Sequence, residues 1–274
     1  MKKIAVFLFV LFITLSAAAQ KTVTFKVAYK PNTVYTQNMT QTASNTISYK
    51  ASEEILGMLE AQGVTNPTIT ENKTTSVSVT TTGKLTGTEI PLVTKMSLDA
   101  GTPEKIIPDN TMLFGRVKQD GLPVFDSIQA PGMNPQLKEI FIKTTQATLA
   151  QIIMPEQKVK VGQTFNLNIP LNIPVGPAMM NINDTAVYKL IKVEGTKAYF
   201  DVNHTYTIDT DVNGQPIKGS GTGTGKVVHD LANNYILKQD ITMTMQMGFD
   251  TNGITMDIKS GTVITMDCTI SAAK

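Results

Sequence analysis

Four consecutive segments near the C-terminal end place their apolar residues on one shared face. In Ala198–Val212 the apolar residues fall on even positions, which is typical of a strand because side chains alternate sides along it. Asn213-Gly214 follows, and this dipeptide favours a two-residue hairpin turn. The turn predicts three pairs across the hairpin: Ile208 with Gly219, Tyr206 with Gly221 and His204 with Gly223.

The next connections preserve this face. Across the turn between Asp230 and Asn234, we expect odd residues of one strand to pair with odd residues of the next. A slip by one residue would pair glycine and valine with the charged Lys238 and Asp240 and would break up the apolar face. The predicted pairs are Val227 with Leu237, Gly223 with Ile241 and Gly221 with Met243. A second Asn-Gly turn, at Asn252-Gly253, leads to a last segment whose apolar residues are even. Three turns and four strands therefore predict one common apolar face.

This face carries a row of glycines beside a row of methionines, and three interpretations are open. The glycines allow a sheet to curve, with Tyr206 covering the bare backbone. In the second interpretation, a helix at Asn134–Ile153 lies across the glycine row. In the third, an apolar ligand lies on the row, because methionine side chains adapt to varied partners. The residues that would contact such a ligand are Tyr206, Gly219, Gly221, Gly223, Met243, Met245, Met247, Met256 and Ile258.

The rest of the chain predicts sheet interrupted by two helices. Val23–Tyr29 alternates like a strand, and Thr74–Thr88 is rich in β-branched residues, which favour strands. Ser52–Gln62 and Asn134–Ile153 combine capping residues with apolar stripes typical of helices. The predicted stripe of the second helix consists of Leu137, Ile140, Phe141, Thr144, Thr148 and Ile152, widened by Leu149 and Ile153. We expect a mainly β (α+β) fold, a large curled antiparallel sheet or half-barrel with one or two covering helices. Such half-open barrels hold apolar guests beneath their helices.

Residues 1–20 predict a secretory signal peptide. Lys2 and Lys3 precede the apolar run Ile4–Leu15, and small residues follow at positions 16–19. The run is too short to cross a membrane, and no cysteine follows it to carry a lipid anchor. We therefore expect a periplasmic or secreted protein that is not an integral membrane protein. Its domain organisation is predicted as a single β-rich domain at 21–274, or as two halves, 21–130 and 155–274, linked by a helix at 135–153.

Motifs for catalysis or metal binding are missing from the sequence. There is no Gly-x-Ser-x-Gly, and Cys268 is the only cysteine, so we expect no internal disulfide and a small buried thiol. His204 and His229 have no second histidine or acid at ligand spacing, which predicts no zinc site and makes His204 a satisfied core histidine. A net charge of +2 gives no support for nucleic-acid binding. We expect no enzyme activity and no cofactor.

Two kinds of partner are compatible with these patterns. The leading hypothesis is an apolar small molecule, a lipid, an acyl chain or a lipidated envelope protein on the shared apolar face. The alternative is a structural or protein-interaction module, in which Thr74–Thr88 is an exposed edge that pairs with a partner strand.

Ile173–Met180 contains two prolines and cannot be a regular central strand, so it is either tucked into the core or exposed as a lid. Asp126-Ser127-Ile128 and Asp184-Thr185-Ala186 match a short acceptor pattern for O-glycosylation.

Three stretches carry a resemblance to a known family: Met154-Pro155 with Lys160–Phe165, then Tyr188-Lys189-Leu190, then Gly219–Gly225 followed by Asp230. Their order is similar to the Pro…Val-Gly-Asp-x-Trp, Tyr-x-Leu and Gly-x-Gly-then-Asp pattern of a family of exported Gram-negative bacterial proteins, a domain of unknown function. Gln163 and Phe165 stand where that family has Asp and Trp. The resemblance covers most of Thr22–Ile270 and implies an exported β-rich domain without a known activity. The expected architecture is also similar to that of periplasmic lipoprotein carriers, a likeness of fold alone.

Overall fold

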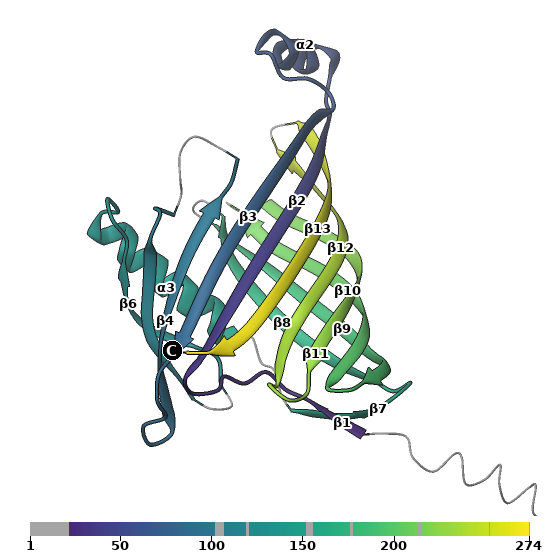
Figure 1. Cartoon of the computed structure of the whole chain (residues 1–274). Coiled ribbons are helices and arrows are strands. Elements are labelled where there is room, and N and C mark those ends of the chain that lie inside the picture. Colours follow the sequence, from purple (N-terminus) through teal and green to yellow (C-terminus); the bar gives the residue numbers. More distant parts are fainter. Residues whose placement is uncertain are drawn as a thin grey trace, which may run out of the picture.

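Eleven antiparallel strands form one curled sheet in the computed structural model, which describes residues 22–101, 107–118, 121–151, 156–175, 178–212, 215–251 and 253–273. The strand order is β6-β5-β4-β3-β2-β13-β12-β11-β10-β9-β8 (Figure 1). The strands are β2 (Thr33–Lys50), β3 (Thr68–Thr82), β4 (Glu89–Asp99), β5 (Thr111–Lys118), β6 (Val124–Gln129), β8 (Thr164–Val175), β9 (Ala178–Glu194), β10 (Lys197–Val212), β11 (Gln215–Asp230), β12 (Tyr235–Thr251) and β13 (Ile254–Ala272).

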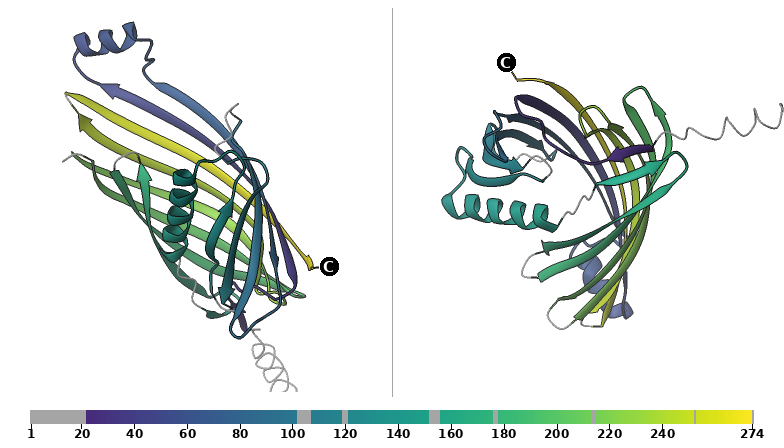
Figure 2. Two further views of the ribbon diagram at one scale, coloured as in Figure 1. Left: turned by 90° about the vertical axis from the view of Figure 1, so that its left-hand side faces the viewer. Right: turned by 90° about the horizontal axis from the view of Figure 1, so that it is seen from below.

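The sheet is not closed, because its edge strands β6 and β8 are not paired with each other. Helix α3 (Pro135–Gln151) contacts both of these edge strands, and Figure 2 shows it beside the opening of the curl. A separate two-stranded sheet, β1 (Thr22–Phe25) with β7 (Gln157–Lys160), lies at the end that we call the lower end. The upper end carries α2 (Glu53–Ala61). The predicted fold class, a mainly β protein with a curled antiparallel sheet, is confirmed.

One face of the sheet, which we call the inner face, carries the apolar side chains of the predicted common surface. The hairpin pairs predicted between β10 and β11 are all found, although the turn residues 213–214 lie outside the described residues. Following paired residues from β10 to β13 and on to β2 keeps the apolar residues on this face. It is also the face on which α3 packs, because Phe141, Ile142 and Leu149 contact the buried side chains of β4, β5 and β6.

The predicted register between β11 and β12 is wrong by two residues. Asp230 pairs with Tyr235, but a bulge leaves Leu237 as an extra residue, so that Val228 pairs with Lys238. A four-residue turn and this bulge together shift the pairing while keeping odd residues against odd ones. The observed neighbours are Gly219 with Met247, Gly221 with Met245, Gly223 with Met243 and Gly225 with Ile241.

The lower end of the inner face is filled with aromatic rings. Phe25 of β1 lies 5.1 Å from the ring of Phe165 and 5.4 Å from that of Phe200, and all three pack with Tyr188. His229 holds the backbone directly after β1 against the sheet, because its Nε2 donates a hydrogen bond of 2.7 Å to the carbonyl oxygen of Lys26. Burial lowers the pKa of His229, so the imidazole is neutral in the folded chain.

This buried histidine predicts acid sensitivity. The pKa of His229 is lower in the folded than in the unfolded chain, so its contribution to stability is present above the unfolded pKa, about 6.5. That contribution is lost as the pH falls below that value toward the folded pKa. We expect urea midpoints of the wild type to fall over this window more than those of His229→Gln, which does not titrate. Parallel midpoint curves for the two chains would contradict this assignment.

The helices begin where the capping residues predict, but α3 is turned differently. Ser52 Oγ accepts from the Ile55 amide at 3.4 Å, and Asn134 Oδ1 accepts from the Leu137 amide at 2.8 Å. The predicted apolar stripe of α3 is wrong in part, because Leu137 and Ile140 are exposed while Ile142 packs on the sheet. Its main contacts on the sheet lie with both edge strands, β6 and β8, so its buried side is set by elements outside the helix.

Several other expectations are corrected or lie outside the described residues. Thr74–Thr88 is not an edge, because β3 lies between β2 and β4; the edges are β6 and β8. The strand predicted at Val23–Tyr29 ends at Phe25. In the segment Ile173–Met180, residues 176–177 lie outside the described residues, and the others belong to β8 and β9: Pro174 of edge strand β8 pairs with Met179 of β9. The signal peptide lies outside the described residues. None of the helices that the structure describes has the length and apolarity needed to cross a membrane.

Candidate functional site

Methionine side chains of β12 lie directly over the glycine row of β11. A Cβ atom added at Gly221 would stand 2.7 Å from Met245 Cγ and would also collide with the carbonyl of Thr244. At Gly223 the same atom would meet Met243 Cγ at 3.1 Å. The curvature therefore brings the two strands too close for any side chain on these glycines.

Tyr206 completes this cover from the other side. Tyr206 of β10 pairs with Gly221 of β11, and its hydroxyl group donates a hydrogen bond of 2.7 Å to Sδ of Met243 in β12. The tyrosine side chain therefore crosses β11. Burial, and then the charge of Asp184, raise the pKa of Tyr206, which keeps the phenol protonated. The interpretation of the glycines as a site of curvature covered by Tyr206 is supported. The interpretation that α3 covers them is wrong, since β12 side chains and β10 side chains occupy the space.

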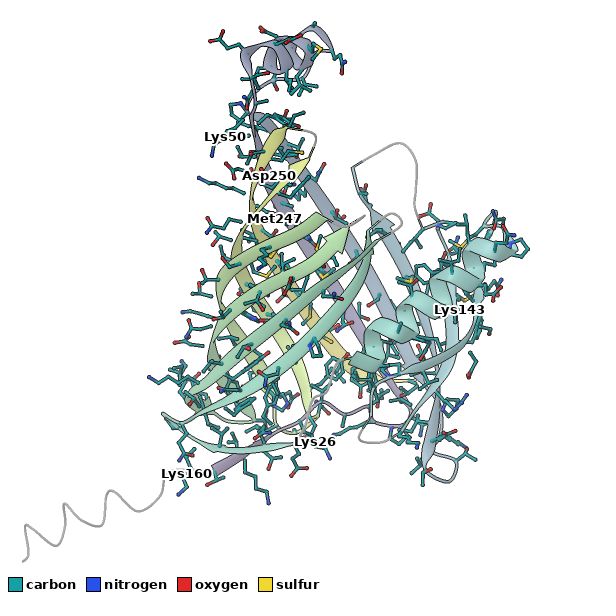
Figure 3. The ribbon with its side chains drawn as sticks, turned by 180° about the vertical axis from the view of Figure 1, so that it is seen from behind. Lys26, Lys50, Lys143, Lys160, Met247 and Asp250 are labelled. Atoms are coloured by element: carbon teal, nitrogen blue, oxygen red, sulfur yellow. The ribbon has the colours of Figure 1, made fainter. Side chains whose placement is uncertain are left out.

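Burial decreases along the inner face of β12, β13 and β2 toward the upper end. Ile241 and Cys268 are buried, whereas the apolar side chains above them are only half-buried. Figure 3 labels Met247 in this upper part, with Asp250 beyond it. We call the half-buried apolar surface the inner strip; it consists of Ile47, Tyr49, Met245, Met247, Phe249, Met256 and Ile258. It is continuous over three neighbouring strands, because Met247 pairs with Ile258 and Ile258 with Ile47, and Phe249 pairs with Met256 and Met256 with Tyr49.

The predicted ligand-contacting residues divide into two groups. Tyr206 and Gly223 are buried and already covered. The others lie half-buried in or beside the inner strip: Gly219, Gly221, Met243, Met245, Met247, Met256 and Ile258. The structure thus brings most of the predicted set together on one surface.

A buried acid–histidine pair lies beside the glycine row. His204 Nδ1 lies 3.0 Å from Asp184 Oδ2 and 3.1 Å from Oδ1, and the two side chains are only 7% and 9% exposed. The His204 ring stacks in parallel with Tyr206 at a centroid distance of 5.6 Å. The second ring nitrogen, Nε2, is buried without a hydrogen-bond partner among the described residues.

Sequence spacing around His204 did not indicate Asp184 as its partner, and the description of His204 as a satisfied core histidine is wrong for Nε2, which has no partner among the described residues. Ala186 of β9 is the direct neighbour of His204, and Asp184 reaches the ring from the next inner position along β9. The signal that was missed is the alternation along β9. Asp184 stands at an even position, as do Ala186, Tyr188 and Leu190, which are all buried on the inner face. A charged residue in such an apolar register requires a buried partner.

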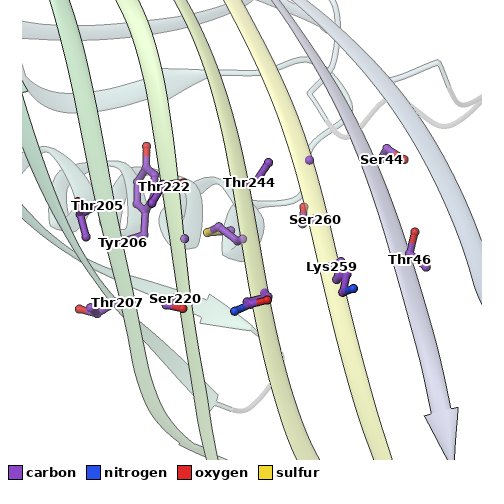
Figure 4. A pocket seen from close by; sticks show the side chains of 14 residues that line it. Ser44, Thr46, Thr205, Tyr206, Thr207, Ser220, Thr222, Thr244, Lys259 and Ser260 are labelled. Carbon is purple, nitrogen blue, oxygen red and sulfur yellow. The ribbon is translucent and has the colours of Figure 1, made fainter.

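A polar groove of about 740 Å³ lies on the opposite, outer face, and sequence reasoning missed it. It crosses β10, β11, β12, β13 and β2, and hydroxyl side chains line it in neighbouring strands (Figure 4). The hydroxyl-bearing lining residues are Ser44, Thr46, Thr205, Tyr206, Thr207, Ser220, Thr222, Thr244 and Ser260. A second depression of the same volume continues toward Lys50, Lys218 and Lys259. Outward threonines are common in strands, and the alternation alone did not indicate that this surface is hollow.

Cys268 is buried as predicted, and burial raises its pKa to about 11. Because the thiolate is the reactive form, we expect almost no reaction with a disulfide reagent at neutral pH in the folded protein. In urea above the unfolding midpoint, one thiol per chain should react with the disulfide reagent, which is measured by the absorbance of the reaction product. Rapid labelling of the native chain would contradict this expectation.

Other predicted site features have limited structural support. Within the described ranges, no group of three His, Cys, Asp or Glu residues is arranged to hold a metal ion. Ser127 is exposed on edge strand β6, so it is accessible as a glycosylation acceptor. At Thr185 the acidic residue of the acceptor pattern, Asp184, points inward to His204, which makes this site a poor acceptor.

Comparisons with known proteins add little to this description. No family model matches the chain, and no curated protein matches it. Among solved structures, the chain is similar to a Bacteroides fragilis protein that is described as inferred to be exported and as having a YmcC-like fold. That similarity has 11% identity and a TM-score of 0.24, over 88% of this chain and 97% of the other. The resemblance to a family of exported proteins of unknown function therefore stays a prediction.

Proposed function

We propose that this chain is a non-enzymatic envelope protein, periplasmic or secreted, that binds an apolar ligand on the inner strip. The ligand class is a lipid, an acyl chain or a lipidated partner. The observation that carries this proposal is the continuous half-buried apolar surface at the upper end. Large apolar patches on soluble proteins commonly mark binding surfaces. Methionines at its centre suit a guest of variable shape.

The direct test is native mass spectrometry of the full chain purified from the periplasm of its own host. We expect a population whose mass exceeds that of the protein by one lipid-sized molecule. A population consisting only of the bare chain would contradict the proposal.

A pair of matched variants locates the ligand. Met245→Asp places a charge in the inner strip, whereas Thr244→Asp places the same charge on the neighbouring outward position of β12. Because an uncompensated charge is costly in an apolar contact, we expect Met245→Asp to reduce the retained lipid at least about tenfold. Thr244→Asp should retain it. Equal retention in folded samples of both variants would count against the inner strip.

A second candidate function uses the outer groove. Its hydroxyl rows and three lysines favour a polar partner surface, which corresponds to a structural or protein-interaction module. Crosslinking from Lys259 to an envelope protein, together with absence of bound lipid, would favour this alternative. Crosslinks confined to other surfaces would oppose it.

A further inference from the structure

The Asp184–His204 pair has the properties of a polar anchor inside an otherwise apolar interior. The Asp184 carboxyl oxygens lie 3.0 and 3.1 Å from His204 Nδ1, so Nδ1 is the ring nitrogen that the pair uses and Nε2 is left for another partner. In an imidazole ring Nε2 is the nitrogen remote from the backbone. It is buried and has no partner among the described residues. A buried polar atom of this kind requires a hydrogen bond to offset its lost hydration.

The surroundings restrict the chemistry of the group that would supply this bond. Of the described inner-face positions of β8–β13, Asp184 is the only acid, and none is lysine or arginine. An incoming carboxylate or phosphate would place its negative charge beside the Asp184 carboxyl group, and among the described inner-face neighbours of Asp184 only His204 is basic. The pair therefore disfavours anionic head groups.

A neutral hydroxyl fits both states of the imidazole. Its O–H donates to Nε2 of the neutral ring, and its oxygen accepts from Nε2–H of the charged ring. The pair also lies next to the route from the inner strip. Gly223 adjoins the His204 Cβ position, and Met243, whose Cγ covers Gly223, has an unbranched side chain that can change rotamer.

We propose that His204, oriented by Asp184, binds the hydroxyl group of a neutral long-chain lipid such as an alcohol or monoacylglycerol. The acyl chain lies on the inner strip, so this inference rests on the proposed function. Met243 and Tyr206 form the boundary between the head-group position and the strip. Free fatty-acid anions are weaker ligands of this site.

The experiment is competition against phenylnaphthylamine, an uncharged apolar fluorophore, on the full chain after delipidation. Dodecanol and dodecanoate are the competitors. The key variant is Asp184→Leu/His204→Phe, which removes both polar groups and leaves no buried charge unpaired. The control is Thr262→Val, which removes a different inner-face hydroxyl opposite Met243.

We expect wild-type protein and Thr262→Val to bind dodecanol more tightly than dodecanoate. The double variant should bind dodecanol about fivefold more weakly while its affinity for the fluorophore is unchanged, as expected for the loss of one hydrogen bond. Equal dodecanol affinity in wild type and double variant, or tighter binding of dodecanoate by the wild type, would overturn the anchor while leaving an apolar site. Failure of the fluorophore to bind the wild type would overturn the proposed function itself.

Discussion

Gly221→Ala is expected to lower the free energy of unfolding by about 2–3 kcal/mol. The added methyl group would stand 2.7 Å from Met245 Cγ and would collide with the backbone of Thr244. A flexible methionine can move aside, but a carbonyl in a sheet ladder cannot move without breaking its hydrogen bond. The cost comes from contact alone, because Gly221 is not among the glycines with positive φ.

Gly261→Ala is the matched control for this prediction. Gly261 also lies inside a long strand, β13, but a Cβ atom there would have no neighbour within 4 Å. We expect no loss of stability, or a gain of about 0.5–1 kcal/mol from the reduced freedom of the unfolded chain. Urea unfolding followed by circular dichroism measures both variants. Similar midpoints for the two would mean that β11 and β12 are not held this close together.

His204→Phe is expected to cost about 3–5 kcal/mol of folding stability. Phenylalanine fills the space of the imidazole but leaves the Asp184 carboxylate buried without its partner. The double variant Asp184→Leu/His204→Phe removes the stranded charge, so it should be more stable than His204→Phe alone although it carries one more substitution.

The order of these two stabilities is the decisive result, since it does not depend on the absolute cost of either variant. A double variant that unfolds at a lower urea concentration than the single variant would contradict a stabilising buried contact between Asp184 and His204. The same series also supplies the folded protein that the ligand competition requires.

Much of this fold could be predicted from the sequence because alternation along a strand determines which side chains share a face. A slip by one residue in β10–β13 would have exposed the apolar set, so parity was strongly constrained. A slip by two residues preserves parity, and nothing in the alternation distinguishes the two registers. The bulge at Leu237 therefore changed the partner of Gly221 from Met243 to Met245 without moving either residue to the other face.

The features that sequence reasoning missed depend on contacts between segments. Asp184 was considered only as part of a glycosylation pattern, although its even position placed it on the inner face beside β10. The buried side of α3 is set by its contacts with β6 and β8, which no local pattern in Pro135–Gln151 records. The outer groove is a property of sheet curvature, so exposed threonines alone could not indicate it.

The prolines of edge strand β8 have a consequence for how the molecule behaves in a crowded compartment. Pro170 and Pro174 both stand at even positions of β8, so their backbone nitrogens lie on the same side of the strand, and neither supplies an amide donor. A second chain that approached this border would meet an interrupted row of donors and could not extend the ladder without gaps. The border therefore resists the strand-by-strand polymerisation to which open sheets are prone.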